Sequence, residues 1–138
     1  ILATKEKAAE MSTDPKIQVQ VLGFGSARVT KGFMPMATVP AAEQALQHAG
    51  IRLDAVKAFK THNPFAVNDV YFCKKTGVAP ERLNRFGSPL VYGHPQGPTG
   101  LRACIEMIEE LVLAGGGYGL FTGCAAGDSS MALVLKVG

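Results

Sequence analysis

The sequence predicts an α/β fold in which a mixed five-stranded sheet has helices packed on it, within a single domain over residues 1–138. Segments with alternating apolar residues are separated by segments with helical spacing, an order that favours a largely parallel sheet. The last two strand segments are joined by a short turn of small residues, so the last strand should run antiparallel to its neighbour. The composition, 47% hydrophobic and 18% charged, is that of a globular core and excludes a disordered chain.

The first half of the chain should supply three strands and two helices. Thr4 is a good cap for the first helix, and Gly50 should end the second. Glycines at 23, 25 and 32 predict a loop after the second strand. The elements expected are a strand end at 1–4, a helix at 5–10, a strand at 17–21, a helix at 38–49 and a strand at 56–61.

The second half should add two helices and a closing hairpin. A helix is predicted from Pro64 to Thr76, followed by an irregular stretch rich in glycine and proline. Apolar residues from Leu101 onward recur at helical spacing until three glycines end the helix at 115–117. The hairpin strands are expected at 118–123 and 131–137.

Charge and cysteine content exclude several classes of protein. The net charge of +3 contains no run of like charges, so we expect no nucleic-acid partner. Three cysteines without a Cys-x-x-Cys pair argue against a disulfide framework or a metal site and favour the reducing cytoplasm. No apolar run is long enough for a membrane span. The chain begins with Ile1, which suggests part of a longer protein.

Three segments place reactive side chains at strand ends or in loops, where the sites of α/β folds usually lie. His62 is the first, because it directly follows a predicted strand and precedes a helix. The N-terminal end of that helix would surround it with N–H groups of positive partial charge. The plainer interpretation is a capping turn with Pro64 as the first helical residue.

His94 lies in the segment Gly-His-Pro-Gln-Gly-Pro-Thr-Gly, from Gly93 to Gly100, just before the long helix. The positive end of that helix would favour the neutral imidazole, the form that a general base needs. The glycines would let a substrate or another segment come close to the backbone. The alternative is a turn with an exposed histidine.

Cys124 leaves a predicted strand into a run of small residues, 125–127, so its sulfur and nearby N–H groups could face a ligand. A thiol has an ordinary pKa of about 8.5, so a neighbouring group would have to make it a useful acid or base at neutral pH. The alternative is a small buried residue, which is what we expect of Cys73 and Cys104.

Taken together, the two histidines and the cysteine, in this order, resemble the thiolase family over nearly the whole chain. The most specific piece is the Gly-His-Pro-x-Gly-x-x-Gly pattern from Gly93 to Gly100, followed by the closing hairpin from Tyr118 to Val137. The segment from Val39 to Leu46 resembles a family helix that begins with Val-Pro-Ala, and Asn84 and Gly87 fit the segment before the histidine loop. The resemblance implies the C-terminal half of a thiolase fold.

The resemblance also implies an activity, an acetyl-CoA C-acyltransferase that performs thioester Claisen condensation or thiolytic cleavage of 3-ketoacyl-CoA. His94 would deprotonate a nucleophilic cysteine, and Cys124 would exchange a proton with the α-carbon of the substrate. His62, with His94, would bind the thioester oxygen as negative charge develops on it. Coenzyme A and acyl-CoA would be substrates with no permanently bound cofactor, contacted by Gly93, Ala126, Gly127 and Phe65.

The sequence departs from the family in three places. The nucleophilic cysteine and most of the CoA-binding loop lie upstream in the family, so the chain alone should be inactive. We therefore expect an N-terminal half, from the same polypeptide or another chain, in a homo- or hetero-oligomer. The segment from His62 to Phe65 is nearer the His-Asp-Cys-Phe form of sterol-carrier-type thiolases than the commoner Asn-Glu-Ala-Phe. Ala126 replaces the glycine of the usual Cys-x-Gly, and alanine restricts φ in the second oxyanion site.

Two other functions remain open on the sequence. One is a non-catalytic thiolase-fold subunit that binds acyl-CoA or a partner protein, which the alanine at position 126 favours. The other is an unrelated hydrolase that uses Cys124 as nucleophile and His94 as base. The hydrolase explains the residue types but neither His62 nor the glycine spacing.

Overall fold

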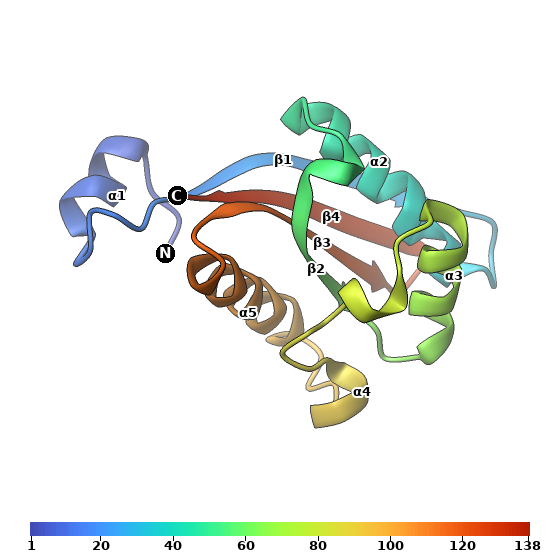
Figure 1. Cartoon of the computed structure of the whole chain (residues 1–138). Helices are drawn as coiled ribbons and strands as arrows, with labels where there is room; N and C mark the ends of the chain where they lie inside the picture. Colours follow the sequence, from blue (N-terminus) through green and yellow to red (C-terminus); the bar gives the residue numbers. More distant parts are fainter.

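The computed structural model describes residues 1–138 and contains one four-stranded sheet with the strand order β1-β4-β3-β2 (Figure 1). Helices α2 and α3 lie on one side of the sheet and α5 on the other. In chain order the elements are α1 (Lys5–Met11), β1 (Val19–Arg28), the 3-10 helix η1 (Met34–Ala37), α2 (Thr38–Ala49), η2 (Leu53–Ala55), β2 (Val56–His62), α3 (Ala66–Thr76), η3 (Pro80–Arg82), α4 (Pro89–Tyr92), α5 (Thr99–Leu113), β3 (Gly117–Ala125) and β4 (Ser129–Val137).

The sheet is mixed, and the predictions of an α/β class and of an antiparallel last strand are confirmed. Strand β4 lies between β1 and β3 and runs antiparallel to both. Only β2 and β3 pair in parallel, so the expectation of a largely parallel sheet is wrong. The reason is that the closing hairpin inserts β4 between β1 and β3, and this reverses the direction at two of the three pairings.

The sheet has four strands where five were expected, because residues 1–4 form no strand. Ile1 and Leu2 are fully exposed, and no other strand lies beside them to receive their backbone hydrogen bonds. A strand without a partner is not stable in water. The helix that follows, α1, does form where predicted, with Thr4 accepting from the N–H of Lys7, but it lies away from the sheet (Figure 1).

Gly23 and Gly25 lie inside β1 and not in the loop that the sequence predicted. Their lack of side chains serves packing, because α2 crosses directly over them. A Cβ built on Gly23 would come within 2.6 Å of the carbonyl oxygen of Ala45, and one built on Gly25 would collide with the carbonyl oxygen of Ala41. The glycines therefore set how closely α2 approaches the sheet.

Helix α2 has the bounds that the sequence predicted, and Gly50 ends it in a left-handed conformation with φ 66°. Its buried face is made of small residues, so it can lie against the glycines of β1. Helix α3 begins two residues later than predicted and is ended by Gly77 at φ 74°. None of the helices is both long enough and apolar enough to cross a membrane.

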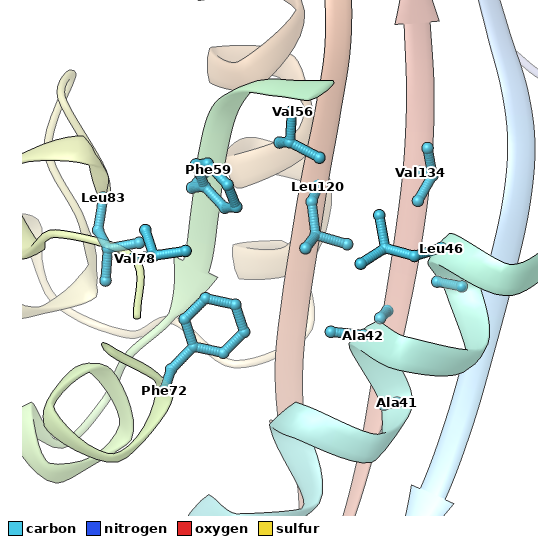
Figure 2. Close-up of a cluster of buried hydrophobic side chains, with 12 residues drawn as sticks. Ala41, Ala42, Leu46, Val56, Phe59, Phe72, Val78, Leu83, Leu120 and Val134 are labelled. Carbon is cyan, nitrogen blue, oxygen red and sulfur yellow. The ribbon is translucent and has the colours of Figure 1, made fainter. Parts of the chain in front are cut away.

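Two apolar clusters hold the layers together. The larger one fills the space between the sheet and α2 and α3 (Figure 2). In that view Phe59 and Leu120 project from β2 and β3 toward Phe72 of α3. The smaller cluster lies under α5 and consists of Ala58, Met107, Leu111, Leu135 and Val137.

The stretch between α3 and α5 follows the outer edge of β2. Leu83 forms a parallel bridge with Phe59, and the N–H of Asn84 donates to the carbonyl oxygen of Phe59 at 2.9 Å. Helix α4 interrupts the stretch that was expected to be irregular. This anchoring fixes the path of the chain toward the loop that carries His94.

We expect Gly25→Ala to lower the free energy of unfolding by about 1–3 kcal/mol, the usual cost of overpacking. The added methyl group must push the backbone of α2 away from β1. Urea unfolding measures the change. Gly97→Ala is the matched control, because its Cβ would meet nothing within 4 Å. Equal stability of the wild type and Gly25→Ala would contradict this packing.

Candidate active site

His62 is the last residue of β2 and lies opposite Gly123 of the parallel neighbour β3. Since side chains alternate along a strand, His62 shares its sheet face with Lys60, whose ammonium contacts Glu106 on α5 at 3.2 Å. The Nδ1 atom of His62 lies 3.0 Å from the carbonyl oxygen of Cys124. The parallel register therefore brings the end of β2 to the cysteine at the end of β3.

His94 belongs to the loop between α4 and α5, directly after Gly93 at φ 86°. Its ring centroid lies 4.3 Å from that of His62, with the two ring planes tilted by 54°. The Nδ1 atom of His94 lies 2.9 Å from the hydroxyl of Thr99, which is buried at the start of α5. This hydroxyl and the ring of His62 fix where the His94 imidazole lies.

Cys124 lies within β3, one residue before its end, and is buried with 6% of its surface exposed. Its sulfur is 3.8 Å from Nδ1 of His62 and 2.9 Å from the side-chain nitrogen of Asn68 on α3. His62 contacts both Cys124 and His94, so the structure gathers the three side chains singled out in the sequence into one cluster. Their roles in a reaction stay predictions.

The hydrogen bonds determine where the protons lie in the neutral cluster. A carbonyl oxygen only accepts, so Nδ1 of His62 carries a hydrogen and donates it to Cys124. The Nε2 atom of a neutral His62 is then an acceptor. Both nitrogens of His94 lie 3.2 Å from this Nε2, so an N–H of His94 must fill the contact. Neutral His62 therefore has no N–H left for another ligand.

Burial affects the two groups at the centre of the cluster in opposite directions. It lowers the pKa of His62, and the nearby His94 lowers it further, because both disfavour the imidazolium. Burial raises the pKa of the Cys124 thiol, while the hydrogen bond from Asn68 acts against that rise. Both groups are thus driven toward their neutral forms.

The four residues expected to contact coenzyme A lie around this cluster at the surface. Phe65 precedes α3 and is 57% exposed, and Gly93 is exposed beside His94. Ala126 and Gly127 form the exposed turn between β3 and β4. Ala126 is not among the residues with positive φ, so alanine causes no backbone strain there. The effect of the alanine on the second oxyanion site stays a prediction.

Cys73 and Cys104 lie apart from the cluster, on α3 and α5, and both are partly buried as expected of structural cysteines. Burial raises the pKa of Cys104 to about 11, so this thiol stays protonated at neutral pH. They are useful internal references for any measurement on Cys124.

Asn68 and Asp69 belong to the site but were not recognised in the sequence. Asp69 accepts from Thr61 and Asn63, each at 2.5 Å, and so ties α3 to the end of β2. Asn68 is buried together with Phe72, four residues further along α3. A polar residue at helical spacing from a buried aromatic residue was the available signal.

The fold and the cluster together define an α/β protein with a Cys–His site at the carboxyl ends of two parallel strands. Residues 15–137 match the family model described as "Thiolase, C-terminal domain". The chain belongs to the thiolase family, as the sequence motifs suggested.

Relatives with assigned names agree with this membership. The chain is 29% identical over 138 residues to the acetyl-CoA acetyltransferase of Syntrophomonas wolfei, covering 99% of this chain and 34% of that protein. It is also 29% identical to the beta-ketoadipyl-CoA thiolase of Pseudomonas aeruginosa, with the same two coverages. The crystal structure of the Bacillus anthracis acetyl-CoA acetyltransferase superposes with a TM-score of 0.88 at 27% identity, covering 97% and 34% of the two chains. The chain thus spans about a third of the length of these relatives.

We expect an NMR titration to find the pKa of His62 below the ordinary histidine value of about 6.5. In His94→Asn the pKa of His62 should rise only part of the way to that value, because burial is the larger cause and remains. His48, on α2, is the reference histidine in the same spectra. A His62 titration at or above the ordinary value would contradict the effect of burial on this imidazole.

The same shift should appear as a pH dependence of stability. Below about pH 6.5 an unfolded chain protonates this histidine while the folded chain resists, so the free energy of unfolding should fall as the pH falls. The dependence should flatten once the pH is below the lowered pKa of His62. In His62→Gln this part of the pH dependence should be lost, as measured by urea titrations repeated between pH 7.5 and 5. If the free energy of unfolding changes with pH as in the wild type, the lowered pKa of His62 is contradicted.

Proposed function

We propose that this chain supplies part of the active site of a thiolase-type acyl-CoA acyltransferase. The reaction is thioester Claisen condensation, or thiolytic cleavage of 3-ketoacyl-CoA, and coenzyme A thioesters are the substrates. The observation that carries the proposal is the contact of His62 with both His94 and Cys124, on a chain of this family. The names of the relatives, acetyl-CoA acetyltransferases and a thiolase, support the class of reaction.

His94 is the proposed base that takes the proton of a nucleophilic cysteine from the N-terminal half. Both of its nitrogens can donate to His62, and the hydroxyl of Thr99 can donate or accept. The Nε2–H tautomer of His94 keeps both contacts, because Nε2 donates to His62 while Nδ1 accepts from the hydroxyl of Thr99. The hydroxyl can turn to accept instead, which leaves Nδ1 able to receive the proton of the nucleophile.

His62 acts in this proposal mainly through His94. The carbonyl oxygen of Cys124 takes its only N–H in the neutral form, so neutral His62 has none for the thioester oxygen. Once His94 has accepted a proton, it has two N–H groups, one directed to His62 and one to Thr99, and in this proposal the second exchanges the hydroxyl for the developing oxyanion. A donor of this kind is typically worth about 3–4 kcal/mol in the transition state.

Cys124 is the proposed acid and base at the α-carbon of the substrate. Its thiolate removes the α-proton as the C–H bond breaks, and the electron pair moves onto the thioester oxygen as an enolate. In the reverse direction the thiol returns the proton. Phe65, Gly93, Ala126 and Gly127 are exposed around the cluster and are proposed to contact the coenzyme A thioester.

A partner that covers one face of the sheet is also part of the proposal. Phe24, Leu133 and Phe121 lie in register across β1, β4 and β3, on the face that carries α5. Phe24 is 59% exposed, and Leu101 and Ile105 on α5 are also exposed. A contiguous exposed apolar surface of this kind is typical of an interface with another protein segment. The N-terminal half, from the same polypeptide or a separate chain, is the proposed partner in a homo- or hetero-oligomer.

The second candidate is a non-catalytic thiolase-fold subunit that binds acyl-CoA or a partner protein, and the alanine at position 126, whose φ is not positive, is the feature that favours it. Binding of coenzyme A without turnover in the assembled protein would support this candidate. The proposed reducing, cytoplasmic location agrees with three cysteines that are all free.

His94→Ala and Cys124→Ala should each lower turnover by about 10²–10⁴-fold in the assembled protein, meaning this chain together with its N-terminal half. Each change removes a proposed proton-transfer group while the folded state persists. Thiolysis of acetoacetyl-CoA is the assay, with circular dichroism to confirm the fold. Cys73→Ala is the matched control and should keep turnover within about twofold, since Cys73 is not in the cluster. Wild-type rates in either site variant would remove that residue from the mechanism.

The chain by itself should show no thiolysis of acetoacetyl-CoA, because the proposed nucleophilic cysteine belongs to the N-terminal partner. Adding the N-terminal half should restore turnover. The assay measures thiolysis in the same preparation before and after this addition. Substantial activity of the chain alone would overturn the idea of a divided site.

A further inference from the structure

Asn68 is a buried amide whose side chain lies beside Cys124. It occupies the first turn of α3 and is 2% exposed. Its nitrogen lies 2.9 Å from the sulfur of Cys124 and 3.3 Å from the carbonyl oxygen of His62. Asn68 therefore joins α3 to the ends of both parallel strands.

The orientation of this amide follows from its neighbours. The carbonyl oxygen of His62 only accepts, so the side-chain nitrogen of Asn68, and not its oxygen, must face it. The same nitrogen then directs its second N–H toward Cys124. The sulfur is the acceptor in this contact, and a thiolate accepts better than a thiol.

Stability does not explain an asparagine at this position. The Oδ1 atom of Asn68 is buried and has no hydrogen-bond partner. A buried polar atom without a partner costs free energy that an apolar side chain of the same size would avoid. The amide is therefore better explained by what its N–H groups do at Cys124 and His62.

We propose that Asn68 is a positioning residue that favours the thiolate of Cys124 and holds its sulfur at the strand end. The proposal rests on the role of Cys124 given above, that of a thiol exchanging a proton with the α-carbon. Burial alone would leave too little thiolate at neutral pH, and the N–H of Asn68 offsets part of that effect. The hydrogen bond also fixes which side of the sulfur is free for the substrate.

The other charged and titratable groups around Cys124 are engaged in contacts of their own. His62 is held close to it and has its own N–H committed to the carbonyl oxygen of Cys124. Asp69, next to Asn68 on α3, is engaged by Thr61 and Asn63. His94, on the adjoining loop, contacts His62. Arg28, at the end of β1, donates to the carbonyl oxygen of Gly127. Asp128, in the turn between β3 and β4, accepts from the N–H of Gly32. No cation contacts the sulfur of Cys124. The amide of Asn68 is the side chain on α3 that donates to it.

The test is the pH dependence of alkylation of Cys124 by iodoacetamide in the assembled protein, resolved by peptide mass spectrometry. In Asn68→Leu the midpoint should move to higher pH by about one unit, and the rate at pH 7 should fall about tenfold. Asn68→Asp has the same shape but places a carboxylate at the sulfur, so its midpoint should rise at least as far. Cys73 and Cys104 are internal controls whose profiles should not move.

A merely structural role predicts a different result. It would lower the urea concentration at which Asn68→Leu unfolds, because the hydrogen bonds to His62 and Cys124 are lost, and it would leave the alkylation profile of Cys124 in place. Superimposable alkylation profiles for the wild type and both variants would overturn the inference. Should Asn68→Leu fail to fold, the isosteric Asn68→Asp decides the question alone.

Turnover in the same variants separates this inference from the proposed function. If both hold, the pH profile of acetoacetyl-CoA thiolysis should shift in the same direction as the alkylation profile. A shifted alkylation profile with unchanged turnover supports the Asn68 contact and overturns the catalytic role of Cys124. An unshifted alkylation profile, with turnover still lost in Cys124→Ala, overturns the role of Asn68 and leaves the proposed function standing.

Discussion

The parallel register between β2 and β3 is the constraint on which the site depends. It sets His62 opposite Gly123, so the imidazole reaches the carbonyl oxygen of Cys124. A slip by one residue would turn His62 to the other face of the sheet. Phe59 and Leu120, adjacent in this register and both buried against α2 and α3, oppose such a slip. The core therefore specifies the geometry of the site as well as the stability of the fold.

A buried lysine connects that register to the loop that carries His94. Lys60 is 1% exposed, and its ammonium contacts Glu106 of α5 and the carbonyl oxygen of Gly87. Glu106 also accepts from Tyr92, two residues before His94. A buried charge is stable only where such partners surround it, so β2, α5 and the loop keep a fixed arrangement. The two histidines can thus stay in contact although 32 residues separate them.

Local sequence signals were sufficient for most elements, and they singled out the three side chains that the structure brings together. The bounds of α2 followed from its pattern and from Gly50, and the closing hairpin followed from its small-residue turn. Gly23 was misjudged because the sequence does not show that a helix crosses it. The buried contact of Asn68 with Cys124 joins two residues that lie 56 positions apart in the sequence. It depends on how α3 packs against β3, which no local pattern reveals.

Exposed apolar side chains lie beside the cluster, on the face of the sheet that carries α5. Gly123, opposite His62, is paired with Met131, which is 53% exposed on the face that carries Leu133 and Phe121. The two imidazoles are too close to be charged together, and burial disfavours the charge on His62. Both effects therefore keep His62 neutral beside His94. The proposed N-terminal partner therefore has one surface to cover, because the apolar row and the end of β3 that contacts His62 lie on neighbouring residues of the same strand.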